Sequence, residues 1–177
     1  MHAPTAVILA RGLGSRMRRE EPTAAVNAAQ ASVVAAGLKG MIPDAAGRPF
    51  LDHSLSALAD GGVERVVLVV APDAEVIRSY YRTHPPQRLS LEWAVQTEAR
   101  GTADAVLAAE SLVGEGPVLV LHADNLDPVE AIRALVSLGE PGLSAFDRDS
   151  LVREGNIEAE RIAAFALLEI DARGYLR

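Results

Sequence analysis

The run Val66–Val70, which reads VVLVV, most constrains what this chain can fold into, because it is apolar at every position. A strand with one face in water alternates apolar and polar residues, so an uninterrupted apolar run predicts a strand that is buried on both faces. Such strands are typical of parallel sheets that carry helices on both sides. The run therefore predicts the centre of an α/β fold.

Further apolar runs alternate with helical patterns along the chain, which is typical of successive βαβ units. We expect strands at Ala6–Ala10, Arg65–Ala71, Ser90–Gln96, Val118–His122 and Ala163–Ile170. We expect helices at Pro49–Gly61, Asp73–Tyr81, Thr102–Leu112 and Val129–Leu138. The sequence therefore predicts an α/β fold with three layers, αβα, around a mostly parallel, Rossmann-like sheet.

Composition excludes several classes of protein. The chain of 177 residues is 49% hydrophobic and 23% charged, as ordinary globular domains are. Its net charge of −7 argues against an extended nucleic-acid surface, and the absence of cysteine excludes disulfides and thiolate metal sites. No apolar run approaches the roughly 18 residues that a membrane span needs. We therefore expect a soluble, cytoplasmic protein that binds neither nucleic acid nor membrane, with a homo-oligomer left open.

A glycine-rich loop with several arginines, Ala10–Arg19, follows the first expected strand. Glycine lets the backbone approach a ligand closely, free main-chain N–H groups bind anions, and arginine adds forked donors, so the loop suits a phosphate. The dinucleotide pattern G-x-G-x-x-G fails because Met17 stands at the third glycine, and the Walker pattern fails because no lysine follows. Taken alone, the segment could also be a plain βα turn with solvated arginines.

Three more polar clusters come after expected strands or just before an expected helix, where ligands bind in open parallel sheets. They are Lys39–Pro43, Gln96–Ala105 and His122–Asn125. Each has an ordinary structural explanation by itself: Lys39 as a solvated lysine, Thr102 as a helix N-cap and Asp124 as the cap of a turn. Together with the arginine loop, the clusters predict one shared site.

These clusters resemble the motifs of the sugar-phosphate nucleotidyltransferases, the nucleotide-diphospho-sugar pyrophosphorylases with a GT-A-like fold. Leu9–Met17 reads L-A-R-G-L-G-S-R-M and matches the family loop L-A-x-G-x-G-S/T-R-M. Lys39–Pro43 and Gly47–Leu51 are similar to K-x-M/L-x-P and G-K/R-P-I/F/L-I/L. Gln96–Ala105 resembles Q-x-x-x-x-G-T-A-x-A, and Val118–Asn125 resembles a strand that ends in G-D-N. The order and spacing of the motifs agree over essentially the whole chain.

The resemblance implies transfer of a nucleoside monophosphate from a nucleoside triphosphate to a sugar 1-phosphate, with release of pyrophosphate. The implied nucleotide-binding residues are Leu9, Ala10, Gly12, Gly14, Ser15, Gln96, Gly101 and Thr102. Arg16 and Lys39 are the implied catalytic residues, which stabilise the charge of the phosphates. Asp124 is the implied ligand of Mg²⁺, and Gln96 with Gly101 is expected to contact a pyrimidine, with UTP or dTTP as the expected donor.

The chain also departs from the family pattern. Arg11 stands where the family usually has alanine or glycine, and it could either help to bind the phosphates or crowd the base. Phe165–Arg177 resembles the strand pair that precedes the family's E-K-P segment, so a sugar-phosphate lysine and a second metal-binding aspartate are missing. We therefore expect a single nucleotidyltransferase domain at 1–177 that is truncated at its carboxyl end. A non-catalytic nucleotide-binding module and a cytidylyl- or molybdopterin nucleotidyltransferase are the alternatives.

Overall fold

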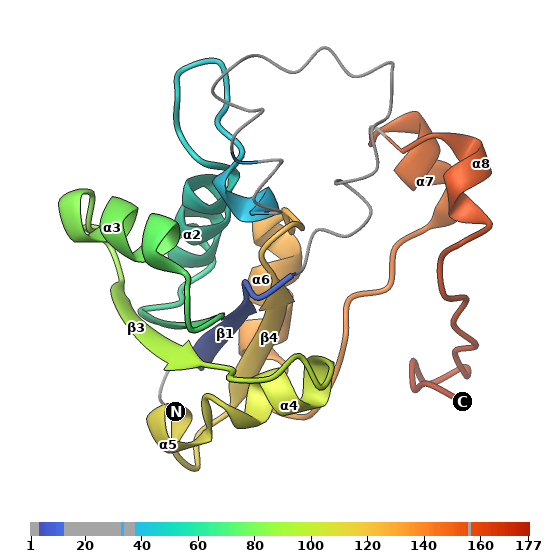
Figure 1. The fold of residues 1–177 in the computed structure, drawn as a ribbon. Helices are drawn as coiled ribbons and strands as arrows, with labels where there is room; N and C mark the ends of the chain where they lie inside the picture. The colour runs from blue at the N-terminus through green and yellow to red at the C-terminus, as the bar shows by residue number, and fades with distance from the viewer. Residues whose placement is uncertain (1–3, 13–32, 34–37, 156) are drawn as a thin grey trace. The chain divides into compact units, whose positions relative to one another are not determined.

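The computed structural model describes residues 4–12, 33, 38–155 and 157–177 (Figure 1). The chain divides into two compact units, one that ends at Gly139 and one that begins at Glu140. The first unit carries the sheet, and the second carries two short helices. None of the helices within these described ranges is long and apolar enough to cross a membrane.

The first unit is built on a four-stranded parallel sheet with the order β3-β2-β1-β4. Its strands are β1 (Thr5–Leu9), β2 (Arg65–Val70), β3 (Ser90–Val95) and β4 (Val118–His122). These strands confirm the first four expected from the sequence. The register sets Leu9 beside both Val69 and His122, so the carboxyl ends of neighbouring strands lie at one edge of the sheet.

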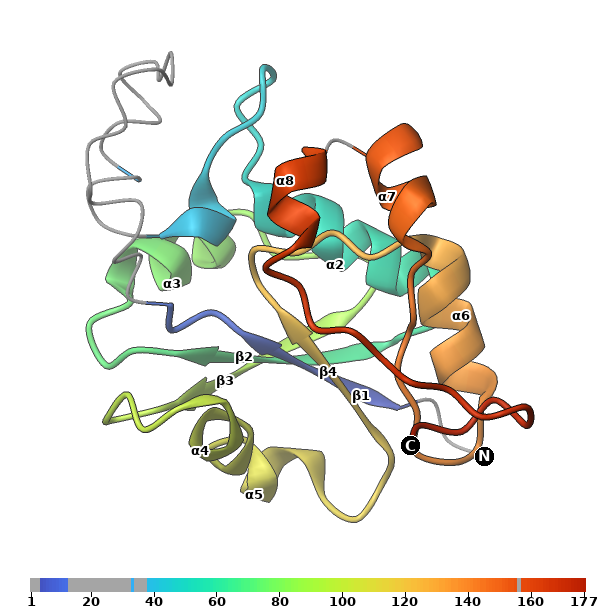
Figure 2. The same ribbon diagram turned by 90° about the vertical axis from the view of Figure 1, so that its right-hand side faces the viewer.

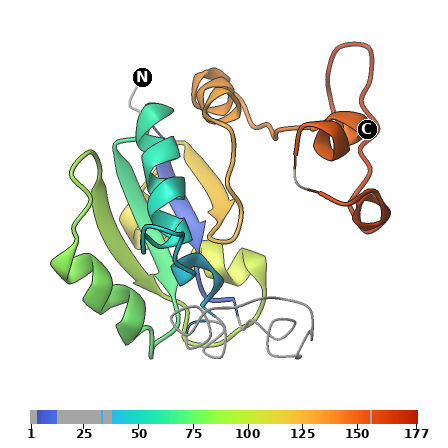
Figure 3. The ribbon, with the colours of Figure 1, turned by 90° about the horizontal axis from the view of Figure 1, so that it is seen from above.

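Helices cover both faces of this sheet, as Figure 2 shows. One face carries α2 (Phe50–Asp60), α3 (Glu75–Thr83) and α6 (Val129–Ser137), and the other carries α4 (Thr102–Leu107) and α5 (Glu110–Val113). Seen from above, the teal α2 lies between the green α3 and the orange α6 (Figure 3). The three-layer αβα fold with a parallel sheet, expected from the sequence, is confirmed.

The apolar run of β2 contributes to two separate hydrophobic cores. Val66, Leu68 and Val70 pack toward α2, α3 and α6, whereas Val67 and Val69 pack toward α4 and α5. Each of these side chains is fully buried. Because successive side chains of a strand point to opposite faces, an unbroken apolar run can fill both layers at once.

The expected helices form, with one interruption. The stretch Thr102–Leu112 was expected to be a single helix but forms α4 and then α5. At the break, the N–H of Ala109 donates to the carbonyl of Val106, three residues back, instead of to that of Ala105. This tighter bond is typical of 3₁₀ turns and ends the regular α-helical ladder.

The second unit contains α7 (Arg148–Arg153) and α8 (Ala159–Ile162). The strand expected at Ala163–Ile170 is wrong, because in the described residues of this stretch only Ile170 pairs, in an isolated bridge with Leu176. The Asp171 carboxylate accepts hydrogen bonds from the N–H groups of Arg173 and Tyr175 and closes a turn between the bridged residues. An apolar sequence becomes a strand only where a neighbouring strand satisfies its backbone groups, and this stretch has too little pairing.

Candidate functional site

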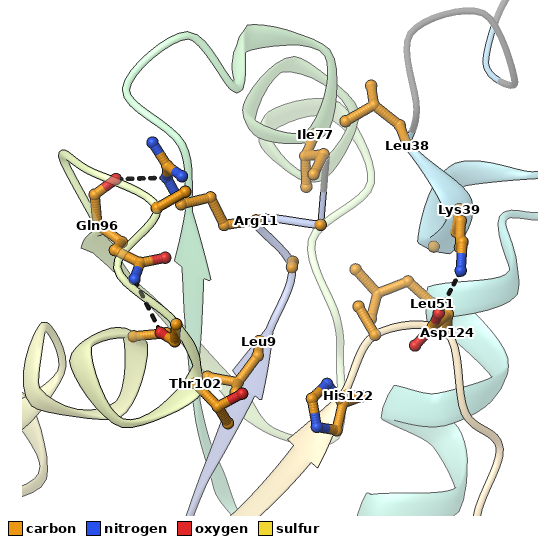
Figure 4. Close-up of a pocket in the computed structure, with 17 residues that line it drawn as sticks. Leu9, Arg11, Leu38, Lys39, Leu51, Ile77, Gln96, Thr102, His122 and Asp124 are labelled. Carbon is orange, nitrogen blue, oxygen red and sulfur yellow. Dashed lines mark hydrogen bonds and ion pairs between the residues drawn. The ribbon is translucent and has the colours of Figure 1, made fainter. Parts of the chain in front are cut away.

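A cavity of about 380 Å³ opens at the carboxyl edge of the sheet, within the first unit (Figure 4). Its walls come from the ends of β1 and β4, from the 3₁₀ helix η1 (Lys39–Met41) and from the loop that leads into α4. The lining includes Leu9, Ala10, Gly12, Lys39, Gln96, Gly101, Thr102 and Asp124. The structure thus brings together every described residue that the sequence predicts for the site. Gly14, Ser15 and Arg16 lie outside the described residues.

The order of the strands explains why the cavity lies beside β1. The chain continues from β1 to β2 and β3 on one side, and β4 then returns to the other side of β1. The N–H of Ala10 donates to the carbonyl of Val69 at 2.8 Å, whereas the carbonyl of Leu9 accepts from the N–H of Ala123 at 3.1 Å. The chain that follows β1 therefore separates from β4 directly after Leu9 and stays bonded to β2 at Ala10. Such a reversal of strand order leaves a crevice, which is the usual ligand site in open α/β sheets.

Lys39 and Asp124 form an ion pair on the wall of the cavity, with 2.8 Å between Nζ and Oδ2 (Figure 4). Burial raises the pKa of Asp124, but the hydrogen bond from Lys39 and its positive charge outweigh burial and hold the pKa below its ordinary value. Asp124 is therefore a carboxylate at neutral pH. Both side chains remain partly exposed, at 39% and 41%, so a ligand in the cavity can reach either charge.

Gly40 allows η1 to approach the loop after β4. A Cβ at this position would lie 3.1 Å from the carbonyl oxygen of Ala123 and 3.4 Å from its Cβ. Lys39 and Asp124 are the chain neighbours of these two residues. Packing of one main chain against the other therefore sets the ion pair.

Replacing Gly40 with valine should lower the free energy of unfolding by about 1–3 kcal/mol, the usual cost of adding side-chain atoms to a packed position. The new atoms would press on the Ala123 carbonyl, and the backbone would have to move apart. Urea denaturation measures the change. Gly116→Val is the matched control, because a Cβ on Gly116 meets nothing within 4 Å. Equal losses in the two variants would show that the contact at Gly40 is not tight.

Gln96 contributes a fixed amide to the cavity, and its side chain is only 4% exposed. Its Nε2 donates to the Gly101 carbonyl at 3.1 Å and to Asp104 Oδ2 at 2.8 Å. Both partners are acceptors only, so the amide nitrogen must face them, and Oε1 points toward the cavity (Figure 4).

Gly101, on the loop that leads into α4, has a φ of 107°, a backbone conformation that favours glycine. Thr102 is the first helical residue and makes no side-chain cap bond, so the N-cap explanation for it is wrong.

Arg11 links the loop after β1 to the loop after β3. Its Nε donates to the Gln96 carbonyl at 2.7 Å and its Nη2 to the Thr97 carbonyl at 3.0 Å. Its Nη1 is buried and has no hydrogen-bond partner among the described residues. These contacts give Arg11 a function that the sequence does not suggest, because it holds the main chain of the loop that carries Gln96.

Several cavity residues were not found by sequence reasoning. Leu38, Leu51 and Ile77 line the apolar part of the wall. Leu51 and Ile77 belong to the buried faces of α2 and α3. Leu51 ends the motif Gly47–Leu51, whereas nothing in the sequence separates Ile77 from an ordinary core residue. Asp104 does not line the cavity but holds Gln96 there, and it lies within the motif Gln96–Ala105 at a position that the motif leaves free.

Comparisons with known proteins match the part of the chain that contains the cavity. The family model described as Nucleotidyl transferase matches residues 5–140. The bifunctional protein GlmU of Parvibaculum lavamentivorans is 37% identical over 126 residues, which are 70% of this chain and 24% of that protein. GlmU of Symbiobacterium thermophilum is 35% identical over 124 residues, which are 68% of this chain and 21% of that protein. The chain thus spans about a quarter of the length of these relatives.

Solved structures share the fold. HddC from Yersinia pseudotuberculosis complexed with GMP-PN has a TM-score of 0.60 at 19% identity, over 98% of this chain and 67% of that one. A UDP-glucose pyrophosphorylase complexed with UDP-glucose has a TM-score of 0.60 at 18% identity, over 77% of this chain and 53% of that one. At these identities the likeness shows the α/β architecture alone.

Proposed function

Because the chain belongs to the nucleotidyl transferase family, we propose that it transfers a nucleoside monophosphate from a nucleoside triphosphate to a sugar 1-phosphate. Pyrophosphate is the second product. The observation that carries the proposal is the cavity beside β1, where the strand order reverses. The ion pair Lys39–Asp124 lies on one wall of this cavity, and the fixed amide of Gln96 lies on another. UTP or dTTP is the proposed donor, on the strength of the motif that contains Gln96.

The reaction asks the protein for positioning and charge, not for covalent chemistry. An oxygen of the sugar 1-phosphate forms a bond to the α-phosphorus, and the bond from that phosphorus to the departing pyrophosphate breaks in line. In this proposal the main chain at Leu9, Ala10 and Gly12 contacts base and ribose, and Gly14 with Ser15 holds the triphosphate. Arg16 and Lys39 stabilise the charge that builds up on the phosphates.

Asp124 is the proposed ligand of Mg²⁺. In the part of the chain that the structure describes, no three histidine or acidic side chains cluster so as to hold a metal by themselves. One carboxylate nevertheless fits this ion, which commonly takes its remaining ligands from substrate phosphates and water. When bound, the ion would neutralise phosphate charge. The residue's lowered pKa keeps it ionised and able to bind a cation at neutral pH.

The test is an assay of pyrophosphate release with a panel of nucleoside triphosphates and sugar 1-phosphates, together with thermal unfolding. A nucleotide that binds the folded state with Mg²⁺ should raise the melting temperature. Pyrophosphate should appear only when both substrates are present. A shift without pyrophosphate release would instead identify a nucleotide-binding module, and the absence of any shift would remove the proposal altogether.

Replacing Arg16 with alanine should lower turnover by roughly 10²-fold, which is the scale for losing one donor that stabilises transition-state charge. Steady-state pyrophosphate release at saturating nucleotide measures this loss. Arg82→Ala is the control, because Arg82 lies on the exposed side of α3 and pairs there with Glu75. Unchanged kinetics in Arg16→Ala would show that Arg16 has no function in the reaction.

The proposal extends to the setting of the protein. We propose that residues 1–177 belong to a single nucleotidyltransferase domain. We also propose that it acts in the cytoplasm and binds no nucleic acid. The net charge of −7 supports the last point, because an acidic protein repels a polyanion.

A further inference from the structure

We infer that Asp104 determines the base preference of the site by holding the Gln96 amide so that it accepts a hydrogen bond from the base and cannot donate one. The inference rests on the proposed function, because it takes the cavity to be a nucleotide site. Asp104 acts through Gln96 and is therefore a positioning residue.

The hydrogen bonds of Gln96 leave one orientation for its amide. Both hydrogens of Nε2 are engaged, one by the Gly101 carbonyl at 3.1 Å and one by Asp104 Oδ2 at 2.8 Å. A flipped amide would set Oε1 against these two acceptors and leave a carboxylate unpaired in a partly buried place. Gln96 therefore presents Oε1 to the cavity (Figure 4).

The main chain of Gln96 is held as well. Arg11 donates to its carbonyl at 2.7 Å and to the carbonyl of Thr97 at 3.0 Å. The N–H of Gln96 donates to the carbonyl of Val70 at 3.0 Å, so the residue is also tied to β2. With both backbone and side chain fixed, the acceptor cannot move aside to suit a different base.

An acceptor that meets position 3 of a bound pyrimidine would discriminate between pyrimidines. Position 3 of uracil and thymine carries an N–H, which can donate to Oε1. Position 3 of cytosine is a bare ring nitrogen, whose lone pair would face the lone pairs of Oε1. A site with a fixed hydrogen-bonding group rejects a ligand of the opposite pattern, because its own polar group is left unpaired. The arrangement therefore favours a uracil or thymine nucleotide over a cytosine nucleotide.

The variant Asp104→Asn tests this inference in the full chain. Asparagine keeps the shape of the side chain but can donate to Oε1, so in the variant only the Gly101 carbonyl still opposes an amide that turns its Nε2 toward the cavity. We expect wild-type protein to bind UTP at least about tenfold more tightly than CTP, and the ratio to fall by about tenfold in the variant. Isothermal titration calorimetry with each nucleotide and Mg²⁺ gives the ratios. Glu110→Gln is the matched control and should keep the wild-type ratio, because this exposed residue lies on α5 outside the cavity lining.

A second measurement uses wild-type protein and so does not depend on whether the variant folds. 3-Methyluridine triphosphate lacks the N–H at position 3, and 5-methyluridine triphosphate carries the same methyl group away from that edge. We expect the first to bind about tenfold or more weakly than UTP and the second to bind like UTP.

The outcomes separate the two proposals. An unchanged ratio in Asp104→Asn, or equal binding of UTP and its 3-methyl analogue, would overturn the inference and leave the proposed function standing. If wild-type protein bound none of the nucleotides, the proposed function would fall and the inference with it. A lower ratio in Asp104→Asn together with weak binding of the 3-methyl analogue would support both.

Discussion

Replacing Asp124 with asparagine should lower the rate of pyrophosphate release by roughly a thousandfold, the scale for losing charge stabilisation at a phosphoryl-transfer site. The change keeps the size of the side chain but removes the negative charge that faces Lys39 at 2.8 Å. It also removes the proposed ligand of Mg²⁺. Steady-state kinetics at saturating substrates measures the loss. Calorimetry should show, in addition, that Mg²⁺ no longer strengthens nucleotide binding to the variant.

Asp127→Asn provides the matched control. Asp127 lies three positions further along the same loop but does not line the cavity, and burial raises its pKa above the ordinary value. The control should release pyrophosphate at nearly the wild-type rate. If Asp124→Asn were no slower than this control, the carboxylate would have no function in the reaction.

Replacing Leu68 with alanine should lower the free energy of unfolding by about 2–5 kcal/mol, the range for truncating a large buried aliphatic side chain. Leu68 is fully buried in β2, where its register partners are Ile8 and Trp93. The neighbouring strands are fixed by their backbone ladders, so they can close only part of the cavity that the change leaves. Urea denaturation followed by circular dichroism measures the loss.

The control for this prediction is Val76→Ala on α3. Val76 is 54% exposed, so its truncation removes little buried area and should change stability by less than about 0.5 kcal/mol. A loss at Leu68 no larger than that at Val76 would mean that the layer between β2 and the helices is loosely packed.

The fold is largely predictable from the sequence because its strongest signal is local. An apolar run such as Val66–Val70 needs cover on both faces wherever it lies, and this requirement is enough to predict the αβα layers. Ala163–Ile170 shows the limit of such patterns. Its apolar residues resemble a strand, but strand formation depends on a partner elsewhere in the chain, and Leu167 and Ile170 remain exposed.

The candidate site is predictable to a lesser degree. Motif residues such as Lys39, Gln96 and Asp124 can be named from their spacing, and all of them line the cavity. Their hydrogen bonds cannot be predicted in this way, because these bonds depend on how loops from different strands meet in three dimensions. The ties from Arg11 to the β3 loop and from Gln96 to Asp104 are set by strand register and by the turn at Gly101.

The ion pair between Lys39 and Asp124 has a consequence for how charged ligands enter the cavity. Each group partly neutralises the other, so an incoming phosphate competes with the Asp124 carboxylate for the N–H donors of Lys39 and can displace it. On the proposed function, that displacement frees Asp124 to accept a cation at the moment the anion arrives. Ligand binding is then an exchange of ionic partners in which neither partly buried charge is ever left alone, a state that would be costly. The arrival of the anion and that of the cation are thereby coupled through one lysine.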